Sequence, residues 1–123
     1  MATIKSYSDL QQSKKLAEIL PLESADMYYR EVSYGIYDLT VHLPNTAFFP
    51  YPKGIYAWSL SALISVLPIL DNRSPVMSKT FDGEYRVVYH STTYEKAILT
   101  SDYDNPVDAC YEMIIKLNEL KML

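Results

Sequence analysis

The chain of 123 residues is poor in glycine, and this shortage excludes several classes of function. Its 3 glycines, Gly35, Gly54 and Gly83, lie far apart, whereas P-loops and dinucleotide-binding fingerprints need glycines close together. For the same reason the sequence contains no Gly-x-Ser-x-Gly nucleophile elbow. The common nucleotide-binding motifs and the commonest hydrolase motif are therefore absent.

Positive charge and long apolar runs are scarce as well. The 11 Lys and Arg against 15 Asp and Glu give a formal net charge of -4, so we expect no binding to nucleic acid, whose phosphates attract basic surfaces. The longest apolar run, residues 60–70, is too short to span a membrane and contains Pro68, so we expect no membrane association. The first twenty residues show no signal-peptide pattern, which predicts a cytoplasmic location.

Cysteine and histidine are too few to suggest a metal or redox site. The single cysteine, Cys110, falls on an apolar helical stripe, where a thiol behaves as a small hydrophobic side chain. His42 and His90 have no further ligand at the spacing of a zinc site. We therefore expect neither a metal nor a cofactor, and we assign no catalytic residue.

Three segments carry helical signals. Residues 105–121 have Asn105 as a capping residue, Pro106 at the first helical position and apolar residues at steps of three and four. Residues 8–20 begin with Ser8 in a capping-box spacing, and residues 59–67 begin with Ser59 as a cap. These patterns predict helices over all three segments.

Other segments carry strand signals. Residues 36–43 alternate between apolar and polar, and residues 26–33 are a possible partner strand. Asp82-Gly83 indicates a two-residue hairpin turn between strands at 76–81 and 84–90, with a further strand at 94–100. That turn would pair Ser78 with Val87, with Met77 on the opposite face, and would set Lys79 against Arg86 as an unfavourable like-charge pair.

These elements predict one α+β domain over residues 1–123, a length that suits a single hydrophobic core. One antiparallel sheet would contain the strands at 36–43, 76–81, 84–90 and 94–100. The helices would pack on one face of that sheet.

The aromatic residues suggest where a partner could bind. The chain has 12 tyrosines, and its proline-rich segment 44–56 reads as an irregular loop. The candidate binding residues in it are Phe48, Phe49, Tyr51 and Tyr56. Exposed aromatic clusters mark interaction surfaces, but the same side chains could instead fold back and complete the core. The sequence leaves both interpretations open.

Three runs of the chain, residues 20–29, 57–68 and 105–117, look familiar together, and the most specific parts are Trp58-Ser59-Leu60 and Val107-Asp108-Ala109-Cys110. They resemble small uncharacterised proteins of human-gut anaerobic bacteria and of their prophages and mobile elements. The resemblance implies a bacterial cytoplasmic context and no particular chemistry. Accessory proteins of this kind often act by binding another protein, which is an argument by analogy.

The leading hypothesis is a non-enzymatic interaction protein, a monomer or small homo-oligomer, that binds an unidentified protein partner. One alternative is a small hydrolase using a carboxylate pair, either Glu23 with Asp26 or Glu84 with Glu95. The other is a ligand-binding module that uses aromatic stacking. A deep pocket with convergent titratable groups would favour the enzyme, and a flat aromatic patch would favour the interaction protein.

Overall fold

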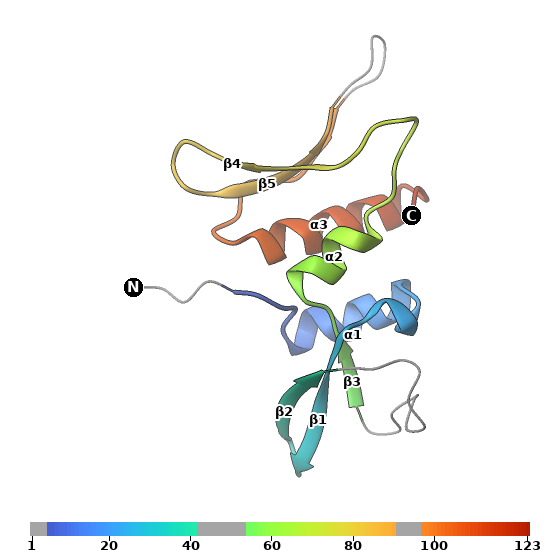
Figure 1. Cartoon of the computed structure of the whole chain (residues 1–123), viewed down its shortest axis with the longest axis vertical. Helices are drawn as coiled ribbons and strands as arrows, with labels where there is room; N and C mark the ends of the chain where they lie inside the picture. Colours follow the sequence, from blue (N-terminus) through green and yellow to red (C-terminus); the bar gives the residue numbers. More distant parts are fainter. Residues whose placement is uncertain (1–4, 42–53, 91–96) are drawn as a thin grey trace. The chain divides into compact units, whose positions relative to one another are not determined.

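The computed structural model describes residues 5–41, 54–90 and 97–123 (Figure 1). The described residues contain α-helices and antiparallel strands, which confirms the α+β class. The chain divides into two compact units: an N-terminal unit of residues 7–62, and a C-terminal unit of residues 63–123 with Lys5 and Ser6. That residues 1–123 act as one domain stays a prediction. In the part of the chain described, no helix has the length and apolar character needed to cross a membrane.

The N-terminal unit contains a three-stranded antiparallel sheet in the order β2-β1-β3. Its strands are β1 (Met27–Ser33), β2 (Ile36–Val41) and β3 (Gly54–Ala57). The pairing of β1 with β2 through Tyr34 and Gly35 confirms the suspected partner strand, and Gly35 takes the positive φ (74°) that favours glycine in such a turn. The interpretation of 44–56 as loop throughout is wrong at its end, because β3 begins at Gly54, beyond the last proline, and pairs with β1.

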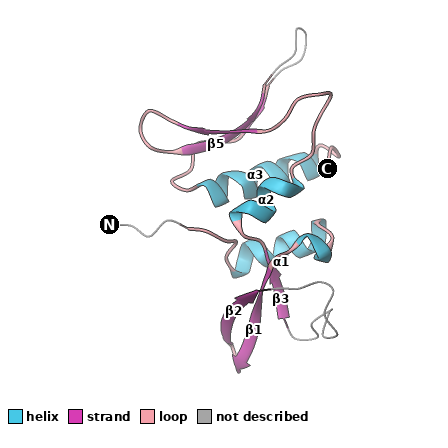
Figure 2. Ribbon diagram, in the orientation of Figure 1, coloured by secondary structure: helices cyan, strands magenta, loops and turns pink. Residues whose placement is uncertain are grey.

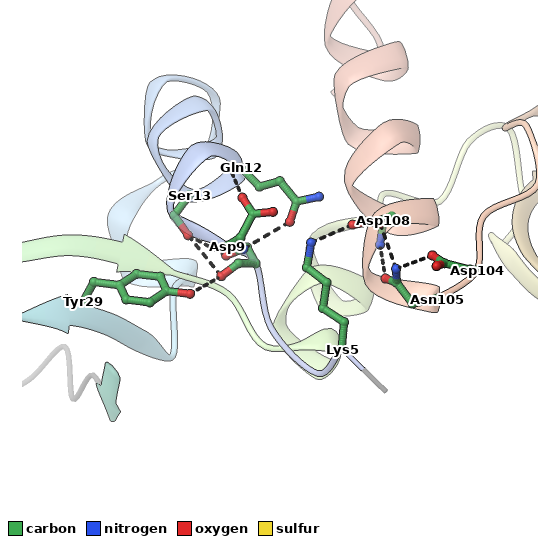
Figure 3. A network of polar contacts seen from close by, with 9 residues as sticks. Lys5, Asp9, Gln12, Ser13, Tyr29, Asp104, Asn105 and Asp108 are labelled. Atoms are coloured by element: carbon green, nitrogen blue, oxygen red, sulfur yellow. Dashed lines mark hydrogen bonds and ion pairs between the residues drawn. The ribbon is translucent and has the colours of Figure 1, made fainter. Parts of the chain in front are cut away.

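Helix α1 (Leu10–Ile19) confirms the helix predicted at 8–20 but begins two residues later, and its cap is Asp9 and not Ser8. Its capping box is formed by Asp9 and Gln12: Asp9 Oδ1 accepts from the Gln12 amide at 2.8 Å, and Gln12 Oε1 accepts from the Asp9 amide at 3.1 Å (Figure 3). Ser8 therefore lies just outside the helix. Pro21 follows the helix end as expected and leads into the short 3-10 helix η1 (Leu22–Ser24).

Ser8 is instead the centre of a buried hydrogen-bond network, which we call the Ser8 network. Its amide donates to the carbonyl of Trp58 at 2.9 Å, and its Oγ accepts from the Trp58 amide at 3.0 Å. Its Oγ also lies 2.7 Å from Ser13 Oγ, and its carbonyl accepts from the Tyr29 hydroxyl at 2.8 Å. Ser8 thus joins α1, β1 and the segment after β3, and Figure 3 shows Ser13 and Tyr29 converging on this point.

Helix α2 (Leu60–Val66) confirms the helix predicted at 59–67. Ser59 is its cap, since the Ser59 hydroxyl oxygen accepts from the Ala62 amide at 3.2 Å. Asp26 fixes this cap by accepting from the Ser59 amide at 2.8 Å and by a hydrogen bond to the Ser59 hydroxyl. The residue before the cap, Trp58, is fully buried, and its Nε1 donates to Ser24 Oγ at 3.0 Å.

The C-terminal unit contains a second three-stranded antiparallel sheet in the order β4-β5-β6. Its strands are β4 (Val76–Lys79), β5 (Tyr85–Tyr89) and β6 (Ile98–Leu99); residues 94–96 of the predicted fourth strand lie outside the described residues. The prediction that the strand at 36–43 shares this sheet is wrong. A short hairpin gives β2 a neighbour in β1, and local pairing closes a smaller loop than pairing with β4 or β5 would.

The turn between β4 and β5 is one residue longer than predicted, and the predicted register is wrong. Thr80 pairs with Glu84 through a 2.7 Å backbone hydrogen bond, which leaves a three-residue connection with Gly83 at φ 85°. The shift sets Met77 opposite Val87. Because a one-residue shift exchanges the two faces of a strand, Met77 takes the core face that Ser78 was expected to hold.

The observed register also removes the like-charge pair of Lys79 and Arg86. Lys79 lies opposite Tyr85, with its Nζ 5.6 Å from the centre of the ring, while Arg86 lies opposite Ser78. A cation near an aromatic ring is attracted by it, whereas two facing cations repel. Electrostatics and apolar burial therefore favour the same register.

Helix α3 (Pro106–Glu119) confirms the predicted C-terminal helix and its cap (Figure 2). Asn105 Oδ1 accepts from the Asp108 amide at 2.8 Å, and Lys5 Nζ lies 2.8 Å from Asp108 Oδ1 (Figure 3). The predicted apolar stripe is fully buried at five positions: Val107, Cys110, Met113, Ile114 and Leu117. Leu120, the sixth predicted position, is half exposed because it follows the end of the helix.

Replacing Met77 and Val76 separately with alanine distinguishes the two registers. We expect Met77→Ala to lower the free energy of unfolding by roughly 2 kcal/mol, because Met77 packs beside Val87 and Cys110. Val76→Ala should cost about 0.5 kcal/mol, since Val76 is 40% exposed. Urea unfolding of both variants gives the comparison. A larger loss for Val76→Ala would contradict the observed register.

Candidate interaction surface

The β1–β2 hairpin extends beyond the rest of its sheet (Figure 1). Strand β3 pairs with β1 only from Met27 to Arg30, so the described residues give the far half of β1 a single neighbour, β2. Every residue from 30 to 36 is exposed. The hairpin therefore presents a projecting end.

Three large apolar side chains occupy that end. Val32 is 52% exposed, Tyr34 is 99% exposed and Ile36 is 59% exposed. We call these three residues the apolar tip. Single exposed apolar residues are common on protein surfaces, but several close together on one projecting element indicate an interaction surface.

Local contacts join the two strands around the apolar tip. Ser33 pairs with Ile36 across the turn, and the Gly35 amide donates to Glu31 Oε1 at 3.2 Å. Arg30 Nη2 lies 3.3 Å from Asp38 Oδ2 at the base of the projecting half, although both side chains are exposed and such a pair contributes little stability. An ordered contact element loses less entropy on binding than a flexible one does.

The residues predicted to bind a partner fall largely elsewhere. Phe48, Phe49 and Tyr51 lie outside the described residues. Tyr56 lies in β3 opposite Tyr28 and is only 6% exposed, as expected of a residue that completes the core. The binding role of these four residues stays a prediction.

The sequence contained part of the signal for the apolar tip. The turn at Tyr34 and Gly35 was recognisable, and so was the alternation of residues 36–43. What the sequence did not indicate is that the described part of β3 pairs with β1 only from Met27 to Arg30.

The structure describes only some of the side chains considered for catalysis. The Asp26 carboxylate is engaged by Ser59, and Glu95, one member of the second candidate pair, lies outside the described residues. His90 is exposed, and His42 is not described. Within the described ranges, no group of three His, Cys, Asp or Glu side chains could hold a metal ion.

Several titratable groups have shifted pKa values because they are buried. Burial raises the pKa of the Cys110 thiol to about 12. Burial is also the main cause that raises the pKa of Tyr29 to about 12, with smaller contributions from Tyr7 and Asp9. The Tyr89 pKa rises to about 12 through burial and the nearby Cys110, and its hydroxyl donates to the Pro68 carbonyl at 2.6 Å. These groups hold the core together as neutral side chains.

Comparison with known proteins adds no assignment: no protein family, curated protein or solved structure matches the chain.

Alkylation of Cys110 tests the burial of its thiol. With a pKa of about 12, only about one thiol in ten thousand is ionised at pH 8, and the thiolate is the reactive form. We expect iodoacetamide to modify the folded protein at least ~100-fold more slowly than the urea-unfolded chain, as followed by intact-mass spectrometry. Equal rates in the two states would contradict a buried, neutral thiol.

Proposed function

We propose that the protein is a non-enzymatic interaction module that binds a partner protein through the apolar tip of the β1–β2 hairpin. The observation that carries this proposal is the 99% exposure of Tyr34 between Val32 and Ile36, both of which are more than half exposed. An aromatic side chain so exposed buries almost no area on folding. Its apolar surface can stabilise only an assembly with another molecule.

The chemistry of the apolar tip favours recognition by apolar contact. Tyrosine is enriched among the residues that dominate binding energy, and the flanking aliphatic side chains would exclude water from around it. The nearby charges are of both signs, since Arg30 and Asp38 pair with each other. The partner surface should therefore be an apolar groove, and the affinity should depend only weakly on salt.

The proposal includes the bacterial and prophage origin suggested by the resemblance, and it includes a cytoplasmic partner. The aromatic residues Phe48, Phe49 and Tyr51 are a second candidate contact in the same module. A protein that acts by binding a partner needs an exposed contact surface and does not need convergent catalytic groups.

Site-specific photo-cross-linking tests the proposal directly. A photoreactive amino acid placed at position 34 should give a discrete covalent adduct with one protein in the cells that produce the chain. Phe81 is the matched control, because it is an equally exposed aromatic at the tip of the β4–β5 hairpin. The same group at position 81 should give no such adduct.

Alanine variants show whether apolar contact holds the complex. We expect Val32→Ala with Ile36→Ala to lower the yield of the position-34 adduct at least ~10-fold, which corresponds to about 1.4 kcal/mol. Phe81→Ala should leave the yield unchanged. Equal adducts from positions 34 and 81 would overturn the assignment. Loss of the adduct in Tyr51→Ala, with no loss in the alanine variants of the apolar tip, would assign the contact to Phe48, Phe49 and Tyr51 instead.

A further inference from the structure

The C-terminal unit contains a hollow of about 220 Å³ beside α3, and none of the residues that line it belongs to the apolar tip. Its charged and aromatic lining consists of Tyr103, Glu112, Lys116 and Glu119, and Ile115 contributes an apolar patch. The hollow is open and more polar than apolar. It is therefore suited to a small polar ligand and not to an apolar side chain.

Both walls of the hollow are fixed by secondary structure. Glu112, Lys116 and Glu119 follow one another at helical steps of four and three, so α3 presents them on one face. The opposite wall is held to β5: the amides of Tyr85 and Tyr103 donate to each other's carbonyls at 2.6 and 2.8 Å. Thr100 Oγ1, at the start of that wall, accepts from the Val87 amide at 3.0 Å.

The described lining of the hollow carries a net negative charge. Two of its residues, Glu112 and Glu119, carry a carboxylate, and one, Lys116, carries an ammonium group. The pKa of the Tyr103 phenol is raised, first by burial and then by the negative charges of Glu112 and Asp108. The second cause agrees with a negative potential in the hollow. A cation entering the hollow gains from this charge, whereas an anion is repelled.

We propose that this hollow binds an alkylammonium group. The carboxylates of Glu112 and Glu119 accept its N–H donors, and the Tyr103 ring and Ile115 contact the attached methylene carbons. The group could belong to a free diamine or to a lysine side chain of a peptide, which share this chemistry. This inference goes beyond the proposed interaction through the apolar tip and does not depend on it.

Titration of the full chain followed by amide NMR tests the site. n-Butylammonium should shift the signals of Tyr103, Glu112 and Glu119 saturably, whereas n-butanol and butyrate should not. Glu112→Gln and Glu119→Gln should each weaken n-butylammonium binding at least ~5-fold, and Lys116→Gln should strengthen it. Glu18→Gln is the matched control, because Glu18 is an exposed carboxylate on α1, and it should leave the affinity unchanged.

Two further ligands distinguish the possible sources. Tighter binding of putrescine than of a blocked lysine tripeptide identifies a free diamine, and the reverse identifies a peptide. Equal shifts with n-butylammonium and n-butanol would overturn the proposal, as would an unchanged affinity in both glutamine variants. Tyr34→Ala should not change this titration, so failure here is distinguishable from failure of the proposed function.

Discussion

A buried serine, Ser8, is the constraint on which the N-terminal unit depends. Its amide and hydroxyl satisfy both backbone polar groups of Trp58, and its carbonyl receives the hydroxyl of Tyr29. A buried polar group left without a partner costs about 1 to 3 kcal/mol, so these contacts must form together or not at all. They connect the segment before α1 with β1 and with the end of β3. One end of the sheet is thereby anchored.

The apolar tip lies at the end of the β1–β2 hairpin that is remote from the Ser8 network. The described part of β3 pairs with β1 from Met27 to Arg30, near the anchored end, and in the described part of the chain the residues of β1 beyond Arg30 pair only with β2. The apolar side chains of this half of the hairpin, Val32, Tyr34 and Ile36, are each more than half exposed. The same architecture that makes the base rigid therefore leaves Tyr34 available to a partner, and the proposed function follows from this division of the sheet.

The local signals of the sequence predicted the elements well, and they failed where the outcome depends on tertiary contacts. Asn105 and Ser59 cap their helices as expected, because a cap needs only its own first turn. Ser8 was a plausible cap, yet its hydroxyl is used in the buried network and Asp9 takes the position. A dipeptide typical of two-residue turns gave a three-residue turn, since burial of Met77 opposite Val87 sets the register. The exposure of the apolar tip depends on which strands pair and over which residues, and no local pattern contains that information.

Amide hydrogen exchange on the full chain, followed by NMR, tests the central claim most directly. The account predicts that the Ser8 and Trp58 amides exchange as slowly as the paired amides of β1, because all of them open only when the N-terminal unit unfolds. In Ser8→Ala, protection should fall together across α1, β1 and β3. Rapid exchange at Trp58 while β1 remains protected, or loss of protection in one element alone, would contradict the account.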